Sequence, residues 1–282
     1  MTEIISAFCY DKLMLFLTTL GIALIIQVGF FIWAAWQKSD QVTDLSYGLS
    51  FVILAIYLAS LKPIFNLQAL IITMVILWGL RLGSYLFYRI LVIKTDRRFD
   101  GIRENFWQFG KFWLLQGLSI WIILLPAISA LEIDINRVVP PGIDPWETFR
   151  PAPLPWLVVI GICLWLGGWI LETLADWQKF QFKIKPENKH NWIGSGVWSW
   201  SRHPNYFGEM LCWWGIFICV APGLIGWQWL VILGPIYITS LLLFGTGLPT
   251  LEKHYDQIYA DNADYQKYKA KTSILIPWPP KT

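Results

Sequence analysis

The sequence has 282 residues, of which 56% are hydrophobic and only 15% are charged. A soluble domain carries about 25% charged residues to cover its surface, so this composition excludes an ordinary water-soluble protein. The net charge of +3 is too small to argue for nucleic acid as a partner, whereas 19 tryptophans favour the interface between lipid and water.

Seven apolar runs are long enough, or nearly so, to cross about 30 Å of hydrocarbon as helices. Lipid offers the backbone no hydrogen-bond partners, so an apolar run of this length has to form a helix. The sequence therefore predicts an all-α membrane protein of about seven transmembrane helices, organised as a single polytopic domain over residues 1–282. The runs lie at 13–33, 45–61, 67–91, 111–130, 154–175, 205–221 and 224–248.

Positive charges are concentrated in the segments 92–111 and 176–204 and in the tail after residue 249. With seven spans, these three segments lie on one side of the membrane, and segments rich in Lys and Arg stay in the cytoplasm. We therefore expect the N-terminus outside and the C-terminus in the cytoplasm, in a bacterial inner membrane or an endoplasmic reticulum. The proline-dense stretch 139–155 is expected to form a stiff exterior loop.

The four cysteines and three histidines form neither a C-x-x-C pair nor an H-E-x-x-H motif. Three of the cysteines lie inside or beside apolar runs and are typical of small core side chains. We therefore expect neither a disulfide framework nor a metal centre.

Arg81 lies deep in the third run, where an arginine is costly unless it is paired or hydrated. Asp44, before the second run, is one candidate partner. Arg89 is close to the basic end of the same run, and we expect its long side chain to reach the interface.

Two acids, Glu172 and Asp176, stand four residues apart at the end of the fifth run, so a helix places both on one face. One interpretation is a solvated helix end. However, acids are unfavourable near a helix C-terminus. The functional alternative is a pair of acceptors for hydroxyl groups, such as those of a nucleotide ribose.

The segment W-S-W-S-R-H-P-N-Y-F-G-E, residues 198–209, leads into the sixth run. Pro204 suits the first turn of a helix, whose free N–H groups attract anions, and Arg202 adds a fork of donors suited to phosphate. Asn205 and Glu209 share a helix face, and a carboxylate inside a membrane span is a candidate functional group. The simpler alternative is an arginine at the interface and a glutamate that only pairs with a base.

The tail spreads four tyrosines and two lysines over an amphipathic stretch. One interpretation is an interfacial helix with its apolar face on the membrane surface. The other is a segment that folds over a bound anionic cofactor, and the two can coexist. The residues concerned are Tyr255, Tyr259, Tyr265, Tyr268, Lys267 and Lys269.

These motifs resemble the C-terminal half of the steroid 5-alpha-reductase-like membrane proteins, most of all their bacterial-type branch. The resemblance covers roughly residues 40–280 and is densest after residue 160. In that family seven helices enclose a cavity open to lipid, and NADPH lies in the cytoplasmic half of the bundle without a Rossmann fold. The resemblance implies that residues 154–282 form the cofactor-binding half.

Individual roles are implied by the same resemblance. The positions of Asn205, Tyr206 and Glu209 match those around the nicotinamide, and the two acids of the fifth run match an Asn and an Asp that hold the adenosine, with Glu replacing Asn. Lys183 falls near an arginine that meets the phosphates, and Tyr255 matches a tyrosine that closes over the cofactor. The full cofactor-binding set is Glu172, Asp176, Lys183, Arg202, His203, Asn205, Tyr206, Glu209, Tyr255, Tyr265 and Tyr268.

The implied mechanism is hydride transfer to an activated carbon–carbon double bond, followed by protonation. It requires a donor that polarises a carbonyl oxygen as negative charge develops there. In the steroid reductases a Gln-Glu pair in an early helix and a tyrosine in a later one do this. That Gln-Glu pair is not found here, so steroid specificity does not follow. The candidate catalytic residues are Tyr47, Tyr85 and Glu209, with Asp44 and Arg81 as further candidates.

Three functions fit the sequence to different degrees. The first is an NADPH-dependent reductase whose partners are membrane lipid and an apolar small-molecule substrate. The second is a methyltransferase like the isoprenylcysteine carboxyl methyltransferases, which share Arg-His-Pro before a helix and a Tyr-x-x-Tyr tail but bind S-adenosylmethionine. Asn205 and Glu209 favour the reductase. A non-enzymatic scaffold ranks last, because it leaves the acids of the fifth and sixth runs without a purpose.

Overall fold

The computed structural model describes residues 2–64, 66–93, 99–133, 155–188, 191–245 and 247–280. Among these residues the regular secondary structure is helical, with one isolated β-bridge between Ser201 and Ser273 and no strand. The chain divides into two compact units. The first comprises Met1–Val159 and Ile216–Gly234, and the second comprises Ile160–Gly215 and Pro235–Thr282.

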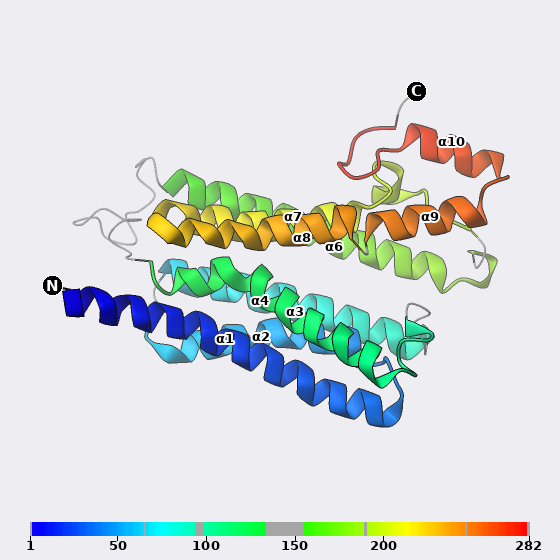
Figure 1. Ribbon diagram of the computed structural model, residues 1–282. Helices are drawn as coiled ribbons and strands as arrows, with labels where there is room; N and C mark the ends of the chain where they lie inside the picture. Colours follow the sequence, from blue (N-terminus) through cyan, green and yellow to red (C-terminus); the bar gives the residue numbers. More distant parts are fainter. Residues whose placement is uncertain are drawn as a thin grey trace. The chain divides into compact units, whose positions relative to one another are not determined.

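The first unit is built on four long helices, drawn from blue to green in Figure 1. They are α1 (Thr2–Gln37), α2 (Thr43–Leu61), α3 (Asn66–Ile93) and α4 (Phe106–Ala130). Helix α1 packs against α2 and α4, and α2 packs against α3. Two short 3-10 turns, η4 (Ala221–Gly223) and η5 (Gly226–Ile232), belong to the same unit, and η5 lies against α4.

A buried polar network joins α1, α2 and α4. Gln116 Nε2 donates to Gln27 Oε1 over 2.9 Å and to Ser46 Oγ over 3.0 Å, and Gln27 Nε2 donates to Ser50 Oγ over 2.8 Å. Because an unsatisfied amide is costly in an apolar interior, these bonds fix the register of the three helices.

The second unit contains most of α6 (Pro155–Lys183), α7 (Pro204–Val220) and α8 (Leu233–Phe244), and all of α9 (Leu248–Ile258) and α10 (Ala263–Lys271). Figure 1 shows α6, α7 and α8 running alongside one another, and Trp214 Nε1 donates to Thr239 Oγ1 across the α7–α8 contact over 3.1 Å. Two 3-10 turns, η2 (Pro186–Asn188) and η3 (Gly196–Ser199), lie between α6 and α7.

The all-α prediction with seven spans is confirmed for the part of the chain that the structure describes. Seven helical segments there are long and apolar enough to cross a membrane. Several apolar side chains on the spans are exposed, for example Ile25 at 71% and Leu115 at 62%, as lipid contact requires. The protein is therefore an integral, multi-pass membrane protein. The spans are Leu13–Gln37, Thr43–Leu61, Leu67–Val92, Phe106–Ala130, Trp156–Lys183, Pro204–Gly223 and Gly226–Ile258.

Two helix boundaries differ from the prediction. The fifth helix continues to Lys183, because its polar last turns pack against residues 191–198, where Trp198 Nε1 donates to the carbonyl oxygen of Ala175 over 3.0 Å. The seventh run, 224–248, contains η5 and α8, and its last residue is the first residue of α9. A Cβ on Gly247 would lie only 2.5 Å from the carbonyl oxygen of Leu242, so the chain turns there in a way that suits glycine. The predicted exterior loop 139–155 lies, up to residue 154, outside the described residues.

Candidate functional site

The candidate site rests on the close crossing of α6 and α7. A Cβ on Gly168 would lie 2.5 Å from the carbonyl oxygen of Gly208, and one on Gly208 would lie 2.8 Å from the backbone nitrogen of Glu172. Further along, a Cβ on Gly215 would lie 2.6 Å from the carbonyl oxygen of Gly161. The two helices are therefore antiparallel and in backbone contact, as small residues allow in lipid.

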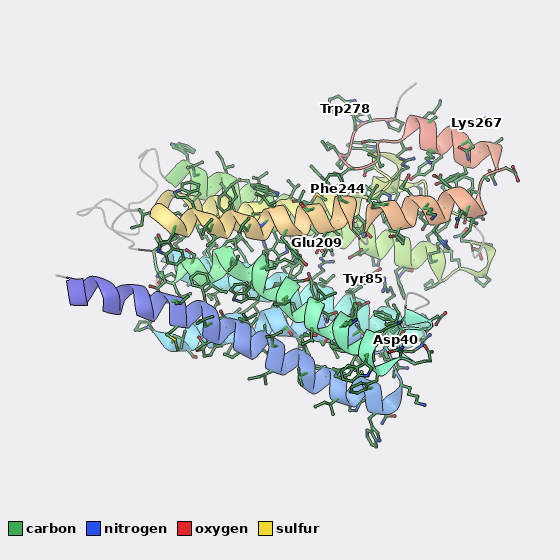
Figure 2. The ribbon with its side chains drawn as sticks, viewed as in Figure 1. Asp40, Tyr85, Glu209, Phe244, Lys267 and Trp278 are labelled. Carbon is green, nitrogen blue, oxygen red and sulfur yellow. The ribbon has the colours of Figure 1, made fainter. Side chains whose placement is uncertain are left out.

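This crossing brings the predicted acids of α6 to the first turn of α7. Asn205 Nδ2 donates to Asp176 Oδ1 over 3.3 Å. Glu172 and Asp176 are both buried, with 2% and 7% of their surface exposed. Glu209, labelled in Figure 2, lies one turn further along α7 and is half-buried. The structure thus brings Asp176 and Asn205 together, with Glu172 and Glu209 each one turn away on its own helix.

A charged cluster at the start of α7 is centred on Glu252 of α9. Arg202 Nη2 lies 3.0 Å from Glu252 Oε2, and His203 Nε2 lies 2.7 Å from Glu252 Oε1. Lys269 Nζ, on α10, lies 4.0 Å from Oε2. Sequence reasoning missed Glu252. The sequence feature that could have indicated Glu252 is an acid in the first turns of a helix that directly follows an apolar run.

Burial determines the protonation state of His203. The ring is 2% exposed, and this burial lowers the pKa of His203 below its ordinary value, while the hydrogen bond to Glu252 opposes the shift only in part. The ring is therefore neutral at pH 7 and donates its Nε2–H to the carboxylate. The ring of Tyr206 stacks on it, with centroids 5.4 Å apart.

The guanidinium of Arg202 keeps donors that the protein does not use. Its side chain is only 10% exposed, and Nε and Nη1 are buried without a hydrogen-bond partner among the described residues. A buried donor without an acceptor is costly, so this pair of N–H groups is suited to an anion such as a phosphate or a carboxylate.

The C-terminal segment holds Arg202 and His203 in place. The backbone N–H of Arg202 donates to the carbonyl oxygen of Ser273 over 2.8 Å. Ser201 Oγ donates to the carbonyl oxygen of Leu275 over 2.7 Å and accepts the N–H of His203 over 3.1 Å. Beyond them, the N–H of Trp278, labelled in Figure 2, donates to the carbonyl oxygen of Trp200 over 3.1 Å.

The tail tyrosines gather around Trp192, which sequence reasoning did not single out. The ring of Trp192 lies 5.2 Å from Tyr265, 5.3 Å from Tyr259 and 6.3 Å from Tyr268, measured between centroids. Tyr268 Oη also donates to the carbonyl oxygen of Trp198 over 2.8 Å. Burial, with help from nearby carboxylates, raises the pKa of Tyr265 to about 12, so this phenol stays neutral. These rings fasten α9 and α10 to residues 192–198.

Two further members of the predicted set lie at the edge of this region. Lys183, at the end of α6, donates Nζ–H to the carbonyl oxygen of Asn191 over 2.8 Å and is exposed. The ring of Tyr255 stacks on that of Tyr259, with centroids 6.0 Å apart. Whether either residue contacts a cofactor stays a prediction.

The predicted catalytic tyrosines belong to the first unit, whereas every predicted cofactor-binding residue belongs to the second. Tyr47, on α2, packs edge-on against Phe51, with centroids 5.2 Å apart, and Tyr85, on α3, is half-buried (Figure 2). The catalytic roles of Tyr47, Tyr85 and Glu209 stay predictions. In the same unit, Asp44 Oδ2 lies 3.0 Å from Arg89 Nη2, so Arg89 forms an ion pair.

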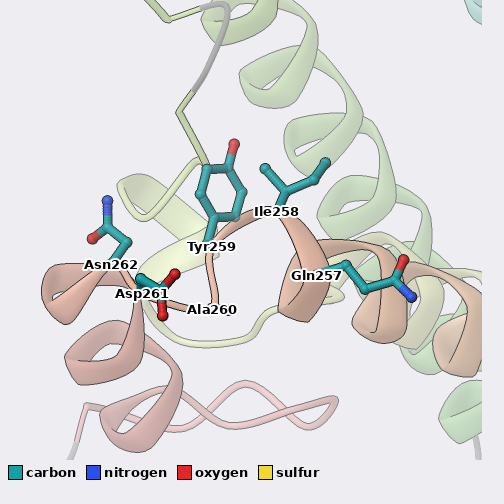
Figure 3. A pocket seen from close by; sticks show the side chains of 6 residues that line it. All are labelled: Gln257, Ile258, Tyr259, Ala260, Asp261 and Asn262. Atoms are coloured by element: carbon teal, nitrogen blue, oxygen red, sulfur yellow. The ribbon is translucent and has the colours of Figure 1, made fainter.

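A surface hollow lies at the turn between α9 and α10 (Figure 3). Six consecutive residues line it and none comes from α6 or α7, so it is not the predicted cofactor site. Its lining residues are Gln257, Ile258, Tyr259, Ala260, Asp261 and Asn262. Within the described ranges, no group of three or more His, Cys, Asp or Glu side chains is arranged to hold a metal ion.

Comparisons with known proteins place the chain in a family. No solved structure matches it. A protein-S-isoprenylcysteine O-methyltransferase of Saccharomyces cerevisiae is 32% identical over 101 residues, which are 34% of this chain and 36% of that protein, so the chain spans about a third of the length of this relative. A model of the family described as "Protein of unknown function (DUF1295)" matches residues 30–272, and the chain therefore belongs to that family.

Proposed function

We propose that this protein is a membrane-embedded, NADPH-dependent reductase of a carbon–carbon double bond in a lipid-like substrate. The observation that carries the proposal is the hydrogen bond between Asp176 and Asn205, at the contact of α6 and α7. It joins the two motifs to which the resemblance assigns the adenosine and nicotinamide ends of the cofactor.

The residues at this end of the second unit fit such a cofactor. The free Nε and Nη1 donors of Arg202 suit a phosphate, and the buried carboxylates of Glu172 and Asp176 suit ribose hydroxyl groups. Asn205 and Glu209 are assigned to the nicotinamide carboxamide, whose amide hydrogens a carboxylate accepts. When bound, NADPH supplies the hydride.

The remaining tasks fall to the chain itself. Glu252 neutralises part of the charge of Arg202 and keeps that side chain in one orientation. The apolar surroundings of α6 and α7 exclude water from the reacting carbon atoms.

Methyl transfer from S-adenosylmethionine is the second candidate. It is favoured by the similarity to the yeast methyltransferase. The carboxylate of that cofactor suits Arg202 as well as a phosphate does, and its adenosine suits the same acids. Asn205 and Glu209 distinguish the candidates, because the reductase resemblance assigns both of them a role.

Thermal unfolding of the detergent-solubilised chain separates the two candidates. A ligand present at about 100 times its Kd stabilises the folded state by about 2.7 kcal/mol, which raises Tm by several degrees. We expect NADPH to do this for the wild type and for the exposed control Glu187→Gln. Asp176→Ala and Glu209→Gln should lose the response. Stabilisation by S-adenosylmethionine alone would support the second candidate, and a response to neither cofactor would refute both.

A further inference from the structure

The segment after α10 is held by its backbone and leaves its large apolar side chains outside. We call residues 273–278 the strap. The carbonyl oxygens of Ser273 and Leu275 accept hydrogen bonds from the segment directly before α7. Ile274 is 43% exposed, Ile276 58% and Trp278 68%, whereas the residues between them are half-buried. The strap therefore cannot turn over to bury these three side chains without breaking its backbone bonds.

Trp200 extends this apolar surface. It is 51% exposed, and its carbonyl oxygen accepts the N–H of Trp278 over 3.1 Å. We call the side chains of Trp200, Ile274, Ile276 and Trp278 the apolar edge. Apolar side chains that are exposed as a group, unlike single ones, mark a surface that contacts a partner.

The position of the strap in the fold indicates that this partner is the membrane. Trp200 stands four residues before Pro204, where the sixth span begins. Along the direction in which α7 and α8 run, Trp278 lies level with Phe244, the exposed last residue of α8 (Figure 2). The headgroup region adds about 5–8 Å to each face of the hydrocarbon core, and tryptophan is enriched there. The apolar edge therefore stands at the level of the headgroups.

The charge of the tail favours anionic headgroups. From Tyr265 to the end of the sequence there are four lysines and neither aspartate nor glutamate. Lys269 pairs with Asp256 of α9, whereas Lys271, directly before the strap, is exposed. Because basic residues next to a membrane surface are attracted to anionic lipids, this composition suits a strap that lies on such a surface.

Helix α10 presents a different surface from the strap. Its tyrosines turn towards the protein, since Tyr265 is only 2% exposed and its ring packs on that of Trp192. The outer face of α10 is polar, with Asp264 and Lys267 exposed. Apolar contact of the tail with the membrane is therefore expected from the strap and not from α10.

We propose that the strap is an interfacial anchor, whose side chains Ile274, Ile276 and Trp278 insert among the anionic headgroups of the leaflet that borders the start of α7. The apolar edge is then removed from water, and Lys271 remains beside the lipid phosphates. Since the N–H of Arg202 donates to the strap, lipid that holds the strap also restrains Arg202. This inference rests on the membrane spans and not on the proposed reductase function.

Fluorescence quenching by lipid tests the anchor on the full chain. Ile276→Cys is labelled with bimane in a chain whose four native cysteines are replaced by alanine. The protein is reconstituted in nanodiscs of phosphatidylcholine and phosphatidylglycerol, which contain lipid with a nitroxide quencher either at the headgroup or at the end of the acyl chain. We expect bimane at residue 276 to lose most of its fluorescence to the headgroup nitroxide, and little to the chain-end nitroxide or to aqueous iodide.

Two exposed positions give the limits of this measurement. Lys267→Cys, on the outer face of α10, should respond to iodide alone, and Ile25→Cys, on the first span, should respond most to the chain-end nitroxide. A response at residue 276 like that at residue 267 would place the strap in water and overturn the inference. Protection from all three quenchers would also overturn it, because a protein, such as a second copy of the chain, would then cover the apolar edge.

A second measurement needs only the wild type. Backbone hydrogen exchange is compared in nanodiscs with and without phosphatidylglycerol. We expect the peptide that contains Arg202 to exchange several-fold more slowly with the anionic lipid, because an anchored strap protects the N–H of Arg202. The turn between α9 and α10 is the control and should exchange equally in both bilayers. Equal exchange of the Arg202 peptide in the two bilayers would contradict an anchor held by anionic headgroups.

Discussion

His203 makes stability depend on pH at the start of α7. Its pKa is lowered by burial, whereas in the unfolded chain it is about 6.5. Between these two values the unfolded chain binds a proton that the folded chain does not. The stability that His203 contributes is therefore complete above about pH 6.5 and is lost as the pH falls towards the lowered pKa.

The variant His203→Gln isolates this effect, because an amide still donates to Glu252 but does not titrate. We expect Tm of the wild type in detergent to fall between about pH 7 and about pH 5, and to fall less steeply in the variant. All other titrating groups are common to both proteins, so the difference between the curves reports His203. Parallel curves would show that the ring is not buried in its neutral form.

At the residue scale, the sequence revealed residues that belong to short motifs, but not the partners that contact them from distant parts of the chain. The sequence singled out Asp176 at the end of the fifth run and Asn205 at the start of the sixth, and in the structure a hydrogen bond joins them. Glu252 was missed because its partner Arg202 lies 50 positions earlier, and no short motif links α9 to the start of α7. The role of Trp192 depends on how the tail folds back, which composition does not reveal.

At the element scale, the contact of α6 and α7 depends on the absence of side chains. Since a Cβ on Gly168 or Gly208 would lie within 2.8 Å of backbone atoms of the other helix, alanine there has to push the helices apart. We expect Gly168→Ala and Gly208→Ala to lower stability by about 1–3 kcal/mol. Thermal unfolding without and with NADPH measures the effect. We expect both variants to have a lower Tm and a smaller rise of Tm with NADPH.

Gly167 supplies the matched control for this prediction. A Cβ added to Gly167 meets nothing within 4 Å, so its substitution changes only helix propensity. Gly167→Ala should be neutral or stabilising by up to about 1 kcal/mol. If alanine at 167 and at 168 had the same effect, the close crossing would not be a property of the folded protein.

Most helices were predictable because lipid leaves an apolar run no other structure. Helix ends were harder to predict, because polar contacts and glycine residues decide where a helix stops. Helix α6 continues to Lys183 through tertiary contacts with residues 191–198, and α8 ends at Phe244, four residues before the predicted end of the last run. The tail divides into α9 and α10 around Asn262, whose side chain accepts the N–H groups of Asp264 and Tyr265.

At the scale of the whole molecule, seven spans and three basic segments predict that the two ends of the chain lie on opposite sides of the membrane. The proposed function depends on this orientation. The segment 176–204 carries four of the predicted cofactor-binding residues, namely Asp176, Lys183, Arg202 and His203. NADPH is a cytosolic molecule that does not cross lipid. An outward-facing site would leave the proposed reductase without its hydride donor.

Cysteine labelling tests this orientation with three exposed positions, Lys62, Asp100 and Glu187. Each is changed to cysteine in a chain whose four native cysteines are replaced by alanine and whose NADPH response is intact. A membrane-impermeant maleimide added outside intact cells should label Lys62→Cys, whereas Asp100→Cys and Glu187→Cys should react only after permeabilisation. Labelling of Lys62→Cys and Glu187→Cys from the same side would place an even number of spans between them, because each crossing reverses the side. That result would contradict both the predicted orientation and the access of cytosolic NADPH to the site.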